Sequence, residues 1–150
     1  MSPLLTAEFP RAVPATILIL RAFIGPCLIV HGLGKLGIVG PGGPNALQGF
    51  AGWLQSLGVP LPGVQARLAM LAELVGGALI LAGLFYRPAA LACMATLAVA
   101  ALIGHKGGGY LITNSPPGNE YALNLAVVLL VMALLGPGAY SLDAALFGGN

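Results

Sequence analysis

Long hydrophobic runs separated by short polar stretches dominate the pattern of the chain. A bilayer core of about 30 Å takes about 20 helical residues to cross, and four runs come close to that length: residues 14–36, 64–86, 88–104 and 119–136. A segment that spans lipid must satisfy its own backbone hydrogen bonds, so each run predicts a helix. We therefore expect an all-α fold, in which residues 1–150 form one domain, a four-helix transmembrane bundle with up-down-up-down connectivity.

The proline and glycine residues between the hydrophobic runs support this arrangement. Pro88 is expected at the first position of the third helix, which leaves a tight hairpin between the second and third helices. The fourth helix is expected to end at Gly136-Pro137-Gly138, because glycine has high backbone entropy and proline lacks an amide donor.

The first long connection has a helical pattern of its own. Between residues 45 and 57, helical spacing places Leu47, Phe50, Leu54 and Leu57 on one face, with polar side chains elsewhere. This pattern predicts a short amphipathic helix in the membrane interface, anchored by Trp53. An ordinary loop helix packed on the bundle is the alternative.

Composition narrows the class of protein. Hydrophobic residues make up 58% of the chain and charged residues 7%, whereas soluble domains carry about 25% charged residues. A water-soluble monomer is therefore excluded. The net charge of +2 is too small for a nucleic-acid partner. Cys27 and Cys93 are not paired in a CxxC motif, so no disulfide framework or zinc site is indicated.

Two ionisable residues fall deep inside predicted spans. Such groups cost at least about 2.5–3.5 kcal/mol on insertion scales, so each needs a partner or a function. Arg21 lies about 10 Å into the first helix and Glu73 about 13 Å into the second. Since antiparallel helices bring them toward mid-bilayer from opposite faces, we expect an Arg21–Glu73 ion pair. The pair either stabilises the helix register or contains a glutamate that handles protons or binds a ligand.

The two charges sit in stripes of small residues, which allow close helix packing in lipid. Glu120 and Asn124 are expected to start a similar stripe on the fourth helix. The stripes of the first two helices consist of Arg21, Gly25, Leu28, Gly32 and Lys35, and of Ala66, Ala69, Glu73, Gly77 and Ile80.

Up-and-down connectivity gathers many polar side chains at one end of the bundle. We expect a site there, opening toward Glu73. His31 and Lys35, at positions i and i+4, share a helix face and could donate hydrogen bonds to an anionic or quinone oxygen, unless they only extend to the interface. The residues at this end are His31, Lys35, Arg67, His105, Lys106, Tyr110 and Glu120.

Other motifs are not supported. His31 and His105 could form a pair of haem or metal ligands, but a metal site usually has three or four ligands and no third His or Cys lies in register. Residues 32–37 spell GxGxxG, but a span precedes them and residues 50–59 contain no acidic residue, so a dinucleotide site is not expected. We expect neither a haem nor a metal site.

Taken together, several short motifs resemble the DoxX/DoxD family of small bacterial inner (cytoplasmic) membrane proteins over most of the chain. The motifs are Arg21, then His31-Gly-x-x-Lys35-Leu; Glu73-Leu-x-Gly-Gly-x-Leu, then Gly83-Leu-x-x-Arg87; Gly118-x-Glu120; and Gly136-Pro-Gly-x-Tyr140-Ser-Leu-Asp143. The resemblance carries over Arg21, His31, Lys35, Glu73, Arg87 and Glu120 as motif positions.

The resemblance implies a role linked to membrane redox chemistry. Relatives include a subunit of a thiosulfate:quinone oxidoreductase and proteins associated with superoxide and thiol stress complexes. We expect Glu73 and Arg21 to be the catalytic pair below a mouth where His31, Lys35, His105 and Glu120 bind a quinone. Without a flavin, metal or dithiol motif, electrons must come from a partner subunit of a redox complex. The alternatives are a non-catalytic scaffold for soluble redox enzymes, and a small-solute carrier or channel built by a homo-oligomer.

Overall fold

A computed structural model describes residues 12–148, and every regular element in that range is a helix, as expected for an all-α protein. The elements are α2 (Ala12–Lys35), the 3-10 turn η1 (Gly43–Asn45), α3 (Ala46–Ser56), α4 (Pro62–Ala82), α5 (Tyr86–Val99), the π-helical continuation η2 (Ala100–Gly104), α6 (Glu120–Leu135) and α7 (Leu142–Phe147).

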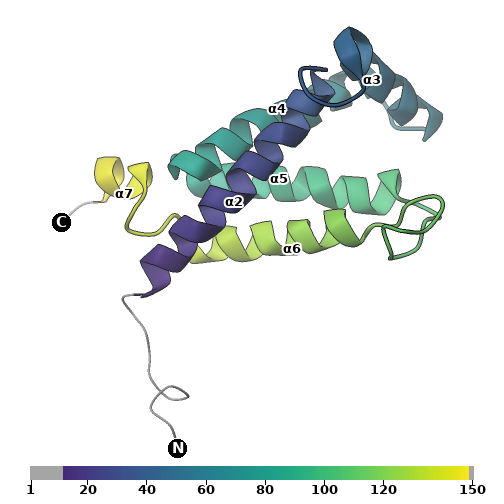
Figure 1. The fold of residues 1–150 in the computed structure, drawn as a ribbon. Coiled ribbons are helices and arrows are strands. Elements are labelled where there is room, and N and C mark those ends of the chain that lie inside the picture. Colours follow the sequence, from purple (N-terminus) through teal and green to yellow (C-terminus); the bar gives the residue numbers. More distant parts are fainter. Residues whose placement is uncertain (1–11, 149–150) are drawn as a thin grey trace, which may run out of the picture.

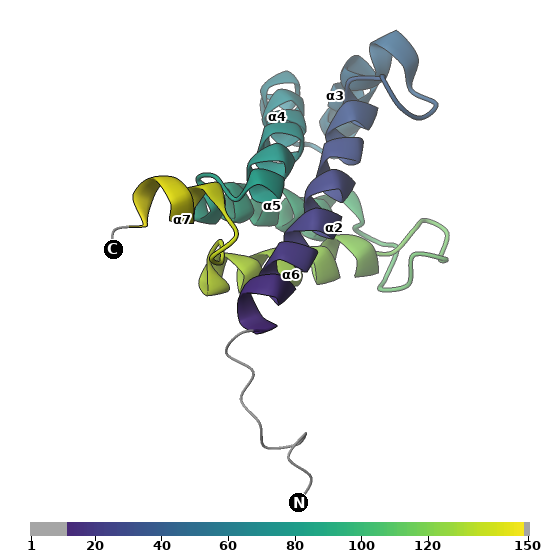
Figure 2. The same ribbon diagram turned by 60° about the vertical axis from the view of Figure 1, so that its left-hand side comes forward.

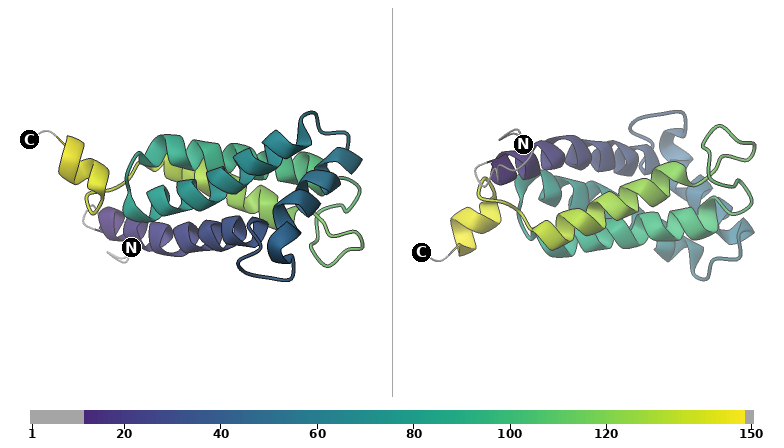
Figure 3. Two further views of the ribbon diagram at one scale, coloured as in Figure 1. Left: turned by 90° about the horizontal axis from the view of Figure 1, so that it is seen from above. Right: turned by 90° about the horizontal axis from the view of Figure 1, so that it is seen from below.

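The long helices lie side by side and alternate in direction, with α4 between α2 and α5, and α5 against α6 (Figures 1 and 3). Three helical segments are long and apolar enough to cross a membrane: Val13–Lys35, Pro62–Ala82 and Tyr86–Gly104. Helix α6 is also apolar but has only 16 residues.

Helix α3 and the loop between α5 and α6 lie at one end of the bundle, and α7 lies at the other (Figures 1 and 2). The helix expected over residues 45–57 is confirmed at Ala46–Ser56. From its apolar face, Leu54 is buried. Trp53 lies so close to Gly104 that a Cβ there would stand 2.9 Å from the indole ring. Helix α3 therefore closes this end of the bundle.

The tight hairpin between α4 and α5 is confirmed, but α5 begins at Tyr86 rather than at Pro88. The corner needs left-handed backbone at Gly83 (φ 67°) and Phe85 (φ 43°). The Asp143 carboxylate accepts hydrogen bonds from the amides of Phe85 (2.8 Å) and Tyr86 (2.9 Å). This distant cap lets the helix start earlier, and Pro88 still falls in the first turn, where an amide donor is not needed.

The predicted stripes form the contact between α2 and α4. Arg21, Gly25, Leu28 and Gly32 are buried on one helix, and Ala66, Glu73, Gly77 and Ile80 on the other. The backbones approach so closely that a Cβ on Gly32 would lie 2.7 Å from the Leu74 amide nitrogen, and one on Gly77 would lie 2.8 Å from the Gly25 oxygen. The small residues therefore set the helix spacing, as expected for packing in lipid.

Candidate functional site

The expected Arg21–Glu73 ion pair is wrong. Arg21 is only 2% exposed, and its guanidinium donates to four backbone carbonyls at the α7 end of the bundle. Nε donates to Ile80 (2.9 Å) and Nη2 to Leu81 (2.8 Å), while Nη1 donates to Pro137 (3.1 Å) and Tyr140 (2.6 Å). Arg21 thus donates to two carbonyls in the last turn of α4 and ties them to the turn after α6. The Ile80 carbonyl also accepts from the Gly83 amide, whereas the Leu81 carbonyl lies where the helix ladder has ended.

The register of the two helices explains the error. Gly25 lies against Leu81, and Gly32 lies against Leu74. Glu73 is therefore level with about residue 33, about 18 Å along α2 from Arg21 at about 1.5 Å per residue. The prediction gives both helices equal depths, whereas the first turns of α4 extend past the end of α2 and pack against α3.

The partner of Glu73 is Lys35, the last residue of α2. Its Nζ forms a hydrogen-bonded ion pair with Glu73 Oε2. The side chains of Lys35 and Glu73 are 19% and 5% exposed, so the carboxylate is buried and the ammonium half-buried. The ammonium also lies 5.2 Å from the centre of the Phe50 ring, on α3. A cation over an aromatic face is stabilised further.

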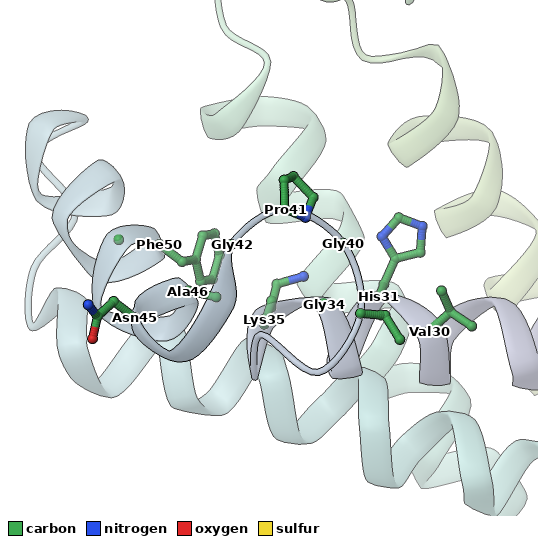
Figure 4. A pocket seen from close by; sticks show the side chains of 12 residues that line it. Val30, His31, Gly34, Lys35, Gly40, Pro41, Gly42, Asn45, Ala46 and Phe50 are labelled. Atoms are coloured by element: carbon green, nitrogen blue, oxygen red, sulfur yellow. The ribbon is translucent and has the colours of Figure 1, made fainter.

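Lys35 and His31 line an open groove of about 730 Å³ between the end of α2 and helix α3 (Figure 4). Figure 4 shows both side chains rising from α2, with Phe50 on the α3 side. The rest of the wall is mostly apolar or glycine: Val30, Gly34, Val39, Gly40, Pro41, Gly42, Asn45, Ala46, Gly49 and Phe50. An apolar wall with a few convergent polar groups is typical of small-molecule sites.

A chain of hydrogen bonds runs from His31 to α6. The Tyr121 hydroxyl lies 3.0 Å from His31 Nε2 and 3.2 Å from Cys27 Sγ. The centres of the His31 and Tyr121 rings are 5.4 Å apart. Glu73 is near enough to interact electrostatically with Tyr121 and Cys93. The ion pair and the chain of hydrogen bonds therefore belong to one polar cluster between α2, α4 and α6.

The structure brings only part of the predicted site together. His31, Lys35 and Glu73 meet at the groove, whereas His105 and Glu120 do not line it. The His105 ring is within 3.1 Å of the Pro117 oxygen, and the Glu120 amide donates to Tyr110, so both residues organise the loop between α5 and α6. Asn124 is exposed and bonds to the Tyr110 hydroxyl, so the expected inward stripe on the fourth helix is wrong at that position.

Sequence reasoning missed Tyr121, Phe50 and Cys27 as members of the cluster. A signal for Tyr121 was present, because up-and-down connectivity brings the start of α6 to the end of α2, where His31 lies. The pattern marks Phe50 only as part of an apolar face. Arg87, a motif position, lies at the opposite end beside Gly136, where a Cβ would stand 3.1 Å from its Nη2.

The arrangement can bind and polarise a ligand oxygen. The Lys35 ammonium and one His31 nitrogen are donors beside an apolar wall, and the Glu73 carboxylate can exchange a proton with its partner. Among the described residues, no group of three or more His, Cys, Asp or Glu side chains is placed to hold a metal ion.

The chain is similar to known proteins. The family model DoxX matches residues 16–106, which include α2 to α5 almost completely. The chain is also 30% identical over 148 residues to the inner membrane protein YphA of Escherichia coli (strain K12), with 95% of this chain and 99% of the relative covered. No solved structure matches.

These similarities agree with the three helical segments of spanning length and with the inward stripes of α2 and α4. The chain is a multi-pass membrane protein and a homologue of an inner membrane protein. It belongs to the DoxX family.

Proposed function

We propose that this protein binds a quinone head group in the groove between α2 and α3 and serves as the membrane subunit or accessory of a redox complex. The observation that carries the proposal is the buried Lys35–Glu73 ion pair, which lies beside His31 at the wall of an apolar groove. Buried ionisable groups in a membrane protein are functional candidates because their insertion is costly.

In this proposal the protein crosses the inner membrane with four helices. The 16 residues of α6 cover about 24 Å, somewhat less than the bilayer core of about 30 Å, and local thinning accommodates such a mismatch at modest cost. Helix α3 then lies at the membrane interface, so the head group of a lipid-soluble quinone can enter the groove from the bilayer.

The residues of the groove fit such a ligand. Phe50, Val30 and Val39 offer an apolar surface to a ring, and His31 and Lys35 offer donors to its oxygens. When bound, a quinone would supply two-electron redox chemistry, with electrons from a partner subunit. Glu73 would accept a proton. Protonation of its carboxylate would weaken the ion pair with Lys35, and the Lys35 ammonium would then be free to turn toward the ligand.

The single tryptophan of the chain provides the test. Trp53 stacks against Phe50 with ring centres 5.8 Å apart, and Phe50 lines the groove. Titration of a short-chain quinone into the purified protein in nanodiscs should quench Trp53 fluorescence saturably. Gly49 lines the groove, and a Cβ added there would enter open space, so Gly49→Leu should fill the groove and abolish saturation.

A matched control separates binding in the groove from partition into lipid. Gly52 is on the same helix, also has open space at Cβ and is not a lining residue, so Gly52→Leu should titrate like the unsubstituted protein. Linear quenching that is equal in all three proteins would contradict the proposal. A Glu73→Gln variant that binds and releases quinone unchanged would remove the role of Glu73.

A second candidate is a scaffold that anchors soluble redox enzymes. Helix α7 favours it, because this helix lies beyond the bundle and exposes Leu142, Leu146 and Phe147. In that case Leu146→Ser should dissociate the native complex on blue-native electrophoresis, while Gly49→Leu should leave it intact. Loss of quinone binding without loss of the complex would favour the first candidate.

A further inference from the structure

The relative strengths of the acceptors assign a direction to the hydrogen-bond chain that ends at His31. The Tyr121 hydroxyl carries one hydrogen and has two neighbours, His31 Nε2 at 3.0 Å and Cys27 Sγ at 3.2 Å. An unprotonated imidazole nitrogen is a good acceptor, whereas a thiol sulfur is a weak one. This difference favours a Tyr121 hydroxyl that donates to His31 and a Cys27 thiol that donates to the Tyr121 oxygen.

This direction fixes the position of the proton on His31. A neutral imidazole that accepts at Nε2 carries its hydrogen on Nδ1. Figure 4 shows the two ring nitrogens on opposite sides of the ring, and His31 is part of the groove wall. The groove therefore receives a donor from Nδ1, and the neighbouring Lys35 ammonium also has only donors.

We propose that Tyr121 is a positioning residue that holds His31 in the Nδ1–H tautomer, so that the groove selects a head group with acceptor oxygens. The choice of ligand rests on the proposed function: a quinone, with two carbonyl acceptors, binds more tightly than its reduced form, whose hydroxyl hydrogens face a wall of donors. The tautomer itself rests only on the hydrogen bonds of Tyr121.

The tautomer is tested without any ligand. The chain has two histidines, so ¹⁵N-histidine labelling of the full-length protein in nanodiscs gives two pairs of ring-nitrogen signals, and His105→Asn identifies the pair of His31. At a pH above about 7.5, where an ordinary histidine is neutral, we expect the Nδ1–H form. An Nε2–H form in the unsubstituted protein would overturn the proposal.

Variants of two tyrosines test the role of Tyr121. Tyr121→Phe removes the donor and should shift His31 to a mixture rich in Nε2–H. Tyr110→Phe is the control, since the Tyr110 hydroxyl bonds to Asn124 and not to His31. An unchanged His31 tautomer in Tyr121→Phe would also overturn the proposal, and circular dichroism confirms that each variant is folded.

The ligand preference is tested by titrating one short-chain quinone in its oxidised and reduced forms. We expect the oxidised form to bind more tightly, and Tyr121→Phe to weaken its binding about three- to ten-fold, as for one lost hydrogen bond. Equal affinity of both forms would overturn the ligand selection. If neither form binds but His31 is in the Nδ1–H form, the proposed function fails and the positioning role of Tyr121 stands.

Discussion

Lys35, the last residue of α2, forms an ion pair with Glu73. Glu73 lies in the middle of α4, and its side chain is almost completely buried. The two charges therefore depend on each other, and their removal should not be additive. The more exposed ammonium can turn toward the interface when it loses its partner, but the carboxylate cannot.

For this reason Lys35→Met should destabilise the protein more than Glu73→Gln does. Breaking a buried pair by removing one partner costs about 3–5 kcal/mol, and we expect Lys35→Met to approach this range. The double variant should recover most of the loss. Thermal unfolding in detergent, followed by circular dichroism, measures all three, and additive losses would contradict a direct pair.

Arg21 should prove structural rather than catalytic. Arg21→Lys keeps the charge but cannot reach four carbonyls in a planar fork, so it should lose at least one charge-assisted hydrogen bond, or about 2–3 kcal/mol of stability. Quinone affinity at the distant groove should not change in the fraction that remains folded. A variant with ordinary stability and altered quinone binding would argue against this assignment.

The close approach of α2 and α4 should not tolerate a methyl group. At Gly32 an added Cβ would lie 2.7 Å from the Leu74 amide nitrogen, so Gly32→Ala should cost about 1–3 kcal/mol through forced separation of the helices. Gly52→Ala, in open space on α3, should instead be neutral or stabilise by up to about 1 kcal/mol. Equal melting temperatures for the two variants would contradict the packing.

Asp143 should hold α7 to the α4–α5 corner. Asp143→Ala removes the acceptor of two backbone amides, and loss of such a cap costs about 0.5–2 kcal/mol. Hydrogen exchange measured by mass spectrometry should become faster at Phe85 and Tyr86 and remain unchanged in the middle of α4. Protection at the corner that survives the substitution would show that the cap is dispensable.

The sequence was sufficient for the helices and for the buried faces of α2 and α4, because both follow from hydrophobic periodicity and from small residues such as Gly25 and Gly77. The face predicted for α6 was wrong at Asn124, which is exposed. The sequence was insufficient for the register between helices. Counting depth from the start of each run places Glu73 opposite Arg21, since nothing in the runs indicates that α4 extends past α2 toward α3. The partners of buried charges depend on that offset, which only packing determines.

The site was partly predictable for the same reason. His31 and Lys35 share a helix face, which spacing alone reveals, and Glu73 stands out as a charge within a span. Tyr121 and Phe50 are ordinary apolar or interfacial residues by pattern, and only the meeting of α2, α3 and α6 gives them a role. His105 and Glu120 lie at the expected end of the bundle, but loop contacts keep them away from the groove.

The four backbone carbonyls that accept hydrogen bonds from Arg21 also have a consequence for biosynthesis. Two of its four acceptors, Pro137 and Tyr140, are translated more than a hundred residues after the arginine itself. A nascent chain that has already inserted its first helix therefore carries a guanidinium with unsatisfied donors until residues 137–140 have been synthesised. A chain truncated after Leu135 would lack both acceptors, so the turn after α6 completes the hydrogen bonding of a side chain that is buried in the first helix.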